Sequence, residues 1–149
     1  MRVSEAMTTD VQIANPDQSI QEAARMMAAI DAGVLPVSDN DRLVGVITDR
    51  DIAVRAVAKG LSPKTKVRDV MSNGNVMYCF EDEEIEDVAH NMGDIKVRRL
   101  PVLNRDKRLV GIISLGDIAM TDGPDSAGEA ICAISEPGGM HSQADEGRG

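Results

Sequence analysis

The apolar positions of the first half of the chain predict an amphipathic helix near the N-terminus. They recur at spacings of three and four residues, which places one side of a helix against a core: Ile20, Ala23, Ala24, Met27 and Ile30. Ser19-x-x-Glu22 opens this run as a capping box, in which the two side chains satisfy free backbone amides. We expect Gly33 to form the C-cap, because glycine adopts the left-handed conformation without strain.

Short apolar runs on both sides of this helix predict three strands. They cover residues 11–13, 34–37 and 43–47. The last run is almost continuously apolar, so we expect it to be buried on both faces. A second helix is predicted to open at Thr48, to run to about Lys59 and to stop at Gly60.

The second half of the chain repeats this order of elements. Strands are predicted at residues 75–79, at 97–103 and from Leu109, with helices through 85–92 and from Ser114. The repeated order β-α-β-β-α predicts an α/β (α+β) fold in which two repeats pack with pseudo-two-fold symmetry. We expect the divisions to be repeat one at 3–60, a linker at 61–66, repeat two at 67–121, and an acidic, Gly-rich, partly disordered tail at 122–149 with a short helix at 127–134.

One element occurs once in each half at the junction of the last strand and the last helix. It reads Gly45-Val46-Ile47-Thr48-Asp49-Arg50-Asp51 in the first copy and Gly111-Ile112-Ile113-Ser114-Leu115-Gly116-Asp117 in the second. The hydroxyl and the carboxylate form a helix capping box, which is one reading. The other reading is a ribose phosphate site, because carboxylates bind hydroxyls and free helix amides favour phosphate. The preceding glycine allows another group to approach the backbone closely.

Composition and charge exclude several classes of function. The net charge is −9, which argues against broad binding to nucleic acids or anionic membranes. The two cysteines and two histidines are scattered and form no metal-ligand pattern, and no Walker loop or dinucleotide fingerprint is present. No apolar run has the length of a membrane span or of a signal peptide, so we expect a reduced, cytoplasmic protein.

With these features in place, residues 3–121 resemble a tandem pair of CBS domains, the Bateman module. The resemblance rests on the duplicated Gly-to-Asp element, on Leu35-Pro36-Val37 and Leu100-Pro101-Val102 upstream of it, and on the β-α-β-β-α order. It implies a non-catalytic module that binds AMP, ADP, ATP, NAD(H) or S-adenosylmethionine in crevices between the repeats and acts as an energy or metabolite sensor. It also implies a homodimer and an effector protein of unknown identity.

The resemblance further implies two ligand sites, each combining the element of one repeat with strands of the other. Site one would comprise Thr48, Arg50, Asp51, Val76, Met77, Val97 and Arg99. Site two would comprise Ser114, Asp117, Val11, Gln12, Gly33 and Val34. The hydroxyl and carboxylate would hold phosphate and ribose, and the aliphatic side chains would enclose the adenine.

The cations near the predicted sites distinguish site one from site two. Arg50 lies inside the first element, and Lys96, Arg98 and Arg99 precede Pro101. These four cations predict a phosphate clamp at site one, unless some of them face solvent or pair with acids. Site two lacks clear cations, so we expect weaker binding there or a ligand with less phosphate charge. The alternative to a sensor is a structural homodimerisation module with non-functional crevices.

Overall fold

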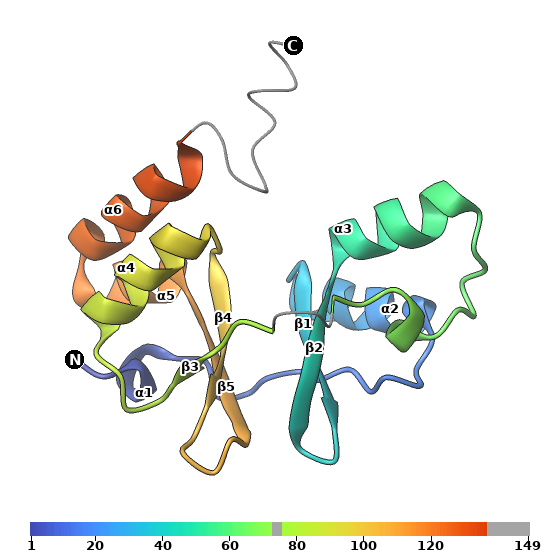
Figure 1. Cartoon of the computed structure of the whole chain (residues 1–149), viewed down its shortest axis with the longest axis horizontal. Helices are drawn as coiled ribbons and strands as arrows, with labels where there is room; N and C mark the ends of the chain where they lie inside the picture. The colour runs from blue at the N-terminus through green and yellow to red at the C-terminus, as the bar shows by residue number, and fades with distance from the viewer. Residues whose placement is uncertain (73–75, 137–149) are drawn as a thin grey trace. The chain divides into compact units, whose positions relative to one another are not determined.

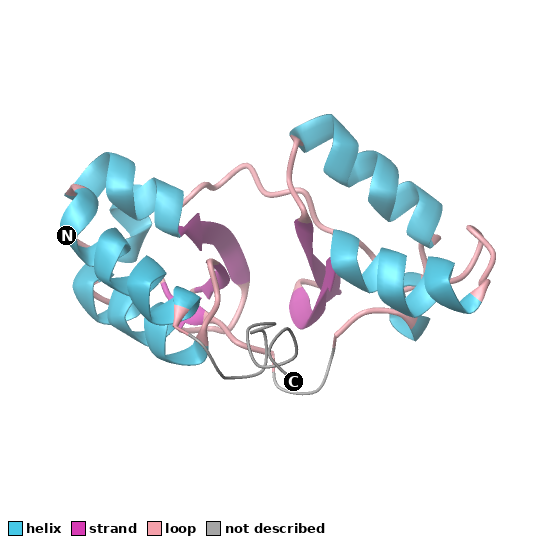
Figure 2. Ribbon diagram, turned by 90° about the horizontal axis from the view of Figure 1, so that it is seen from above, coloured by secondary structure: helices cyan, strands magenta, loops and turns pink. Residues whose placement is uncertain are grey.

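The computed structural model describes residues 1–72 and 76–136, which form two compact units (Figure 1). The repeat-1 unit comprises Asp10–Met77 and Lys107–Leu109, and the repeat-2 unit comprises Met1–Thr9, Tyr78–Asp106 and the described chain from Val110. In each unit the helices cover one face of the strands (Figure 2). The predicted α+β class is confirmed.

The repeat-1 unit is built on an antiparallel pair of strands. β1 (Val34–Asp39) and β2 (Arg42–Thr48) pair in a register that sets Val34 opposite Thr48. The helical elements are α2 (Ile20–Ile30), α3 (Asp49–Asp51), the π-helical η1 (Ile52–Ala56), and the 3-10 helices η2 (Val57–Lys59) and η3 (Val67–Asp69). Its core is aliphatic and consists of Ala14, Ile20, Ala23, Met27, Leu35, Val37, Ile47, Ala56, Val67 and Val70.

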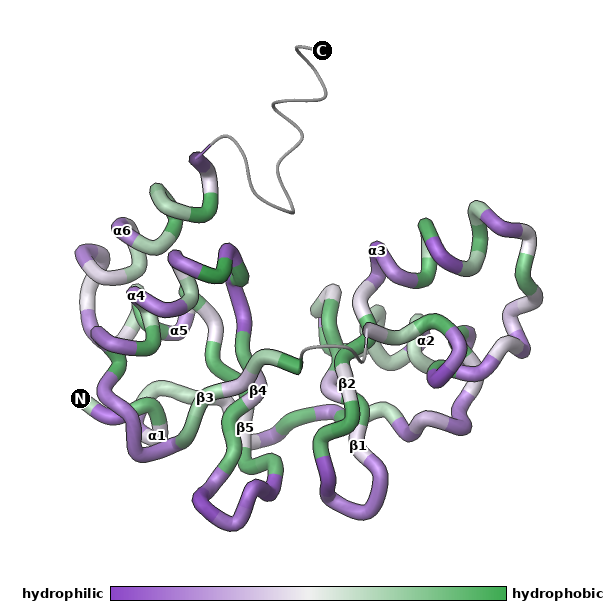
Figure 3. The backbone as a smooth tube through the Cα atoms, in the orientation of Figure 1, coloured by the Kyte–Doolittle hydropathy of each residue, from purple (hydrophilic) through white to green (hydrophobic). Residues whose placement is uncertain are grey.

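The repeat-2 unit contains a sheet in the order β3-β4-β5. These strands are β3 (Cys79–Phe80), β4 (Arg99–Leu103) and β5 (Leu109–Ser114), and β3 runs parallel to β4. The helices are α1 (Val3–Ala6), α4 (Ile85–Ile95), α5 (Leu115–Asp122) and α6 (Pro124–Ser135). The strands are largely apolar, whereas the turns that join β1 to β2 and β4 to β5 are hydrophilic (Figure 3).

Several local predictions are confirmed and several are wrong. Ser19 caps α2 by accepting the Glu22 amide, which is half of the predicted capping box, whereas Glu22 Oε2 accepts from Gln18 Nε2. Ala24 and Ile30, predicted on the buried side, are exposed. The C-cap is Asp31 in the left-handed conformation rather than Gly33, because the short polar side chain of aspartate tolerates it. Strand β2 alternates between buried and half-buried positions instead of being buried on both faces.

The strand predicted at residues 11–13 is also absent, and only Ala14 forms an isolated parallel bridge, with Val37. The strand predicted at 75–79 shortens to β3, and Asn75 lies outside the described residues. The helix predicted from Thr48 opens and ends as expected, at Gly60 with φ 73°, but contains the π turn η1. The helix predicted at 127–134 is present within α6, whereas residues 137–149 lie outside the description.

The short segment that leads into each repeat packs in the unit of the other repeat. The Val3 amide donates to the Glu83 carbonyl, and Val3 is fully buried in the core of the repeat-2 unit. In the same way the Val67 amide donates to the Gln18 carbonyl, and Val67 lies in the core of the repeat-1 unit. Each compact unit is therefore assembled from two stretches that are far apart in the sequence.

Candidate functional site

The repeated element forms the same capping box in both units. Thr48 Oγ1 accepts the Asp51 amide at 3.0 Å, and Asp51 Oδ2 accepts the Thr48 amide at 3.0 Å. Ser114 and Asp117 form the equivalent pair of bonds at 3.0 Å each. The capping interpretation is therefore confirmed. One carboxylate oxygen of each aspartate is engaged by the backbone, which leaves the other oxygen for a further partner.

The glycine at the front of each element is required by a neighbouring backbone. A Cβ added to Gly45 would lie 2.6 Å from the Ser72 carbonyl oxygen, and one added to Gly111 would lie 2.8 Å from the Thr8 carbonyl oxygen. The lead-in segments pair here with β2 and β5, because Ser72 exchanges two backbone bonds with Val46, and Thr8 exchanges two with Ile112. The close approach that the sequence predicts is thus made by the lead-in backbone.

The residue just before each Pro-containing strand also fixes the start of the helix that follows the repeated element. The Asp49 amide donates to the Gly33 carbonyl at 2.9 Å, and the Leu115 amide donates to the Arg98 carbonyl at 3.0 Å. The structure therefore brings Gly33 together with the first element and Arg98 together with the second, each within its own unit. The first amide of each helix is already occupied by a protein acceptor.

The remaining predicted site residues divide between the units. Val11, Gln12, Val34, Val76 and Met77 belong to the repeat-1 unit, with Met77 45% exposed. Val97 and Arg99 belong to the repeat-2 unit, where Val97 packs against the core and Arg99 is exposed. The combination of residues from both repeats in each predicted site stays a prediction.

The two aspartates have different surroundings. Asp51 is only 9% exposed, and Ser72 Oγ lies 3.4 Å from its Oδ1 while Arg55 Nε lies 3.8 Å from the same atom. Asp117 is half-buried, and Thr121 takes the position that Arg55 has in the first repeat. Neither neighbour of Asp51 was predicted from the sequence. Arg55 could have been found from its i+4 spacing, whereas Ser72 is brought close only by the fold.

One of the four predicted cations, Lys96, has a partner of its own within the repeat-2 unit. Lys96 Nζ donates to the Ala133 carbonyl at 2.7 Å, where it neutralises the C-terminal end of α6. The inclusion of Lys96 in a phosphate clamp is therefore not supported. Arg50, Arg98 and Arg99 are exposed.

Asp49 places a negative charge at the start of the first helix. Its Oδ1 accepts the Arg50 amide at 2.8 Å, and its Oδ2 would lie 2.8 Å from a Cβ added to Gly33. This carboxylate occupies the position at a helix N-terminus that would favour an external anion. The second element has Leu115 at the equivalent position and carries no such charge. A phosphate at the first helix start must therefore overcome repulsion from Asp49.

The described residues show no other reactive or metal-binding arrangement. Burial raises the pKa of the Cys79 thiol to about 12, so this thiol is protonated and unreactive at neutral pH. Within residues 1–72 and 76–136, no group of three or more His, Cys, Asp or Glu side chains converges on a metal position. No helix in this part of the chain is long and apolar enough to cross a membrane.

A family model for the CBS domain matches residues 3–57 and 67–121. The chain therefore belongs to the CBS domain family and contains two tandem domains, the arrangement called a Bateman module. It is 40% identical over 134 residues to the CBS domain-containing protein YhcV of Bacillus subtilis, covering 89% of this chain and 94% of that protein. It is 35% identical over 114 residues to Hypoxic response protein 1 of Mycobacterium tuberculosis, covering 76% of this chain and 79% of that protein.

Solved structures of CBS domain pairs have the same fold. The pair of protein MJ0100, in complex with 5′-methylthioadenosine and S-adenosyl-L-methionine, matches with a TM-score of 0.72 and 31% identity over 83% of this chain and 96% of that chain. Hypoxic Response Protein I, with two coordinated zinc ions, matches with a TM-score of 0.74 and 32% identity, over 81% of this chain and 98% of that chain. These ligands belong to those proteins.

Proposed function

We propose that this protein is a non-catalytic regulatory module that binds an adenosine-containing ligand and acts as an energy or metabolite sensor. The ligand class is AMP, ADP, ATP, NAD(H) or S-adenosylmethionine. The observation that carries the proposal is the duplicated capping box, which presents a hydroxyl and a carboxylate at the start of a helix twice in one chain. The adenosine-type ligands of the related MJ0100 pair support the same class.

The proposed contacts combine residues of both repeats. In site one, Thr48 and Asp51 would hold ribose and phosphate, Arg50 and Arg99 would neutralise phosphate, and aliphatic side chains would enclose the adenine. The aliphatic residues of site one are Val76, Met77 and Val97. Site two would use Ser114 and Asp117 with Val11, Gln12, Gly33 and Val34. The exposed arginines favour phosphate at site one, and Asp49 opposes it.

A thermal-shift series with AMP, ATP, NADH and S-adenosylmethionine tests this function directly. A ligand that binds only the folded state at 100 times its dissociation constant stabilises that state by about 2.7 kcal/mol and raises the unfolding midpoint. We expect at least one of the four to raise it in a concentration-dependent way. The absence of a shift with all four at millimolar concentration would overturn the sensor proposal.

The alternative function is structural homodimerisation without a ligand. It is favoured by the low exposure of Asp51, whose carboxylate already has the Thr48 amide and Ser72 as partners. Asp51→Ala separates the two functions. If the protein is a sensor, the variant binds ligand more weakly but stays folded and keeps its oligomeric state. If the capping box is purely structural, the variant is less stable and neither it nor the unaltered protein binds ligand. Asp117→Ala is the matched variant in the second repeat.

The proposed function also includes a location, an oligomeric state and a partner. We propose that it works in the cytoplasm as a homodimer, without nucleic acid or membrane, and that an effector protein reads the bound state. The net charge of −9 supports the exclusion of nucleic acid and anionic membrane. Nucleotide hydrolysis by the pure protein, abolished by Asp51→Ala or Asp117→Ala, would instead show that it is an enzyme.

A further inference from the structure

Helix α6 lies outside both CBS domains and packs on the helices of the second one. The family model ends at residue 121, whereas α6 spans Pro124–Ser135. The helix contacts both α4 and α5 (Figure 1). A Cβ added to Gly93 on α4 would lie 3.2 Å from both Ala130 Cα and Ala133 Cβ, so α4 and α6 are in close contact. Helix α6 is therefore an addition to the tandem module that packs on its second repeat.

The sequence of α6 provides little support for a helix in isolation. Its N-cap, Gly123, makes no side-chain hydrogen bond, its last turn contains no basic residue, and Gly128 lies in its middle. A helix of 12 residues is marginal in water without tertiary packing. Its fully buried residues are Ala127 and Ala130, whose small side chains bury little apolar area. The helical state of α6 therefore depends on a docking contact that is itself weak.

Lys96 supplies the cation that the last turn of α6 lacks. Its Nζ donates to the Ala133 carbonyl at 2.7 Å, and a cation at this position stabilises the C-terminal end of a helix. Lys96 is also the C-cap of α4, in the left-handed conformation with φ 59°. The equivalent C-cap in repeat one is Asp31, whose charge would repel a helix C-terminus, and the described residues of the repeat-1 unit form no counterpart of α6.

A short segment beside α6 connects this helix with the proposed ligand sites. This corner segment, residues 96–99, includes Val97 and Arg99, which belong to proposed site one. The Arg98 carbonyl accepts the amide of Leu115, the first residue of the helix in the second repeated element. The bond to α6 therefore fixes the first residue of a segment whose next residues belong to one proposed site and contact the other.

We propose that α6 is a reversibly docked regulatory helix and that Lys96 couples its docking to ligand binding. When α6 is docked, the bond to the Ala133 carbonyl orders the corner segment and holds Val97 and Arg99 in place for the ligand. A site whose residues are already ordered binds more tightly than one that the ligand must order. Bound ligand in turn favours the docked helix, because coupling between two sites is reciprocal. The inference rests on the proposed function and adds what the effector protein reads, which is the docking of α6.

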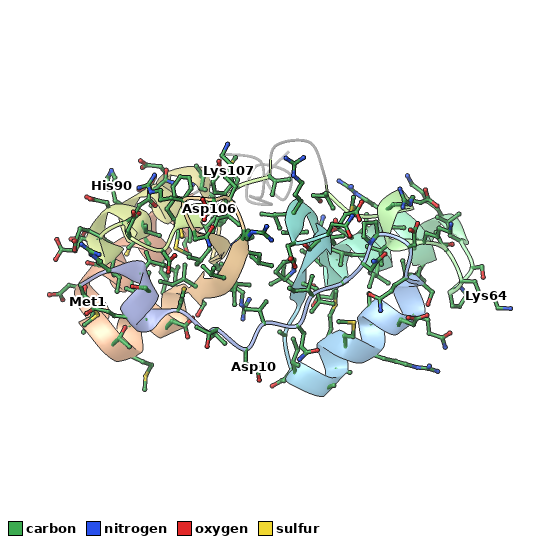
Figure 4. All side chains as sticks on the ribbon, turned by 90° about the horizontal axis from the view of Figure 1, so that it is seen from below. Met1, Asp10, Lys64, His90, Asp106 and Lys107 are labelled. Carbon is green, nitrogen blue, oxygen red and sulfur yellow. The ribbon has the colours of Figure 1, made fainter. Side chains whose placement is uncertain are left out.

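Hydrogen exchange of the α6 amides, at residues 125–135, measures docking in the whole protein. Lys96→Met removes the bond to Ala133 and is expected to accelerate this exchange roughly tenfold, whereas Lys96→Arg keeps a donor and should restore slow exchange. Lys107→Met is the matched control, because Lys107 has the same left-handed backbone, with φ 61°, and is exposed in the turn before β5 (Figure 4). Unchanged exchange in Lys96→Met, or equal acceleration in Lys107→Met, would overturn the role of Lys96.

Displacement of α6 tests its coupling to the ligand. Gly93→Leu places a side chain where Ala130 and Ala133 now lie, with circular dichroism to verify that the variant is folded. Titration with AMP, S-adenosylmethionine and adenosine is expected to show binding weakened by roughly fivefold or more for each ligand that binds the wild type. The same ligand at saturation should slow the exchange of α6 in the wild type. Gly128→Ala is the control, because a Cβ there meets nothing within 4 Å, and it should leave affinity unchanged.

The outcomes distinguish this inference from the sensor function. If a ligand binds the wild type and Gly93→Leu equally well, the coupling is overturned and the sensor function stands. A loss confined to AMP, with adenosine unaffected, would also overturn the coupling, because it would show an effect on phosphate alone. If none of the three ligands binds the wild type, both proposals are overturned. Weaker binding of charged and uncharged ligands alike, together with slower exchange of α6 in the bound protein, is the expected result.

Discussion

Ser72 Oγ lies 3.4 Å from Oδ1 of Asp51, and this contact joins the segment that leads into the second repeat to the carboxylate of the first. Ser72 is held there by two backbone bonds with Val46 in β2. The proposed ribose-binding carboxylate is therefore coupled to the connection between the repeats. A displacement of Ser72 would remove this partner from Asp51 Oδ1.

Ser72→Ala tests this coupling. Loss of the hydroxyl removes one hydrogen bond to a charged group and is expected to lower the free energy of unfolding by about 1–2 kcal/mol and to change nucleotide affinity. Thr8→Ala is the control, because Thr8 has the equivalent place beside Ile112 and its side chain is exposed. Urea denaturation and ligand titration of both variants provide the measurement. Equal effects of the two substitutions would show that Ser72 has no special role.

Gly45→Ala is expected to destabilise the fold. The added Cβ would lie 2.6 Å from the Ser72 carbonyl, a backbone atom, so the lead-in segment must shift at a cost of about 1–3 kcal/mol. Gly128→Ala is the matched control, because a Cβ there meets nothing within 4 Å and alanine favours the helix by roughly 0.5–1 kcal/mol. The two substitutions should therefore shift the unfolding midpoint in opposite directions. A stable Gly45→Ala variant would contradict the packing role assigned to this glycine.

Asp49→Asn is expected to strengthen binding of phosphorylated ligands. The substitution removes a negative charge from the start of the first helix while keeping a side chain that can accept the Arg50 amide. Affinity for ATP should rise roughly three- to tenfold, and affinity for adenosine should change little, because adenosine carries no charge. Isothermal titration with both ligands measures the difference, with Asp10→Asn as the control for net charge. An equal gain for both ligands would show that Asp49 does not act on phosphate.

The two thiols should differ in their reactivity, and Cys79 should affect how the free energy of unfolding depends on pH. Cys79 is buried with a pKa of about 12, whereas Cys132 is exposed, so a thiol reagent at pH 8 should label Cys132 alone in the folded protein. Because the folded pKa of Cys79 is raised, its contribution to stability is present below its unfolded pKa and is lost as the pH rises toward 12. Cys79→Ala removes that part of the alkaline loss, and urea denaturation between pH 8 and 11 measures it. Rapid labelling of Cys79 in the native state would contradict its burial.

The sequence alone determined the features that depend on local chemistry. The spacing of Thr48 and Asp51, and of Ser114 and Asp117, is sufficient to specify a capping box, because all of its hydrogen bonds lie within one helical turn. Helix α2 and the strand pairs β1-β2 and β4-β5 followed from the apolar pattern, whereas the strand predicted at 11–13 did not form. Together with the duplication, these features also indicated the family.

Only the tertiary structure decided which distant segments meet. That Val3 packs with the second repeat and Val67 with the first depends on contacts between residues far apart in the chain, which no local pattern encodes. The same holds for Ser72 beside Asp51 and for Lys96 on the end of α6. Each of these pairs is fixed by how whole elements bury their apolar faces. The repeated glycine predicted that another group approaches the backbone closely. Only the folded chain shows that this group, at Gly45, is the Ser72 carbonyl.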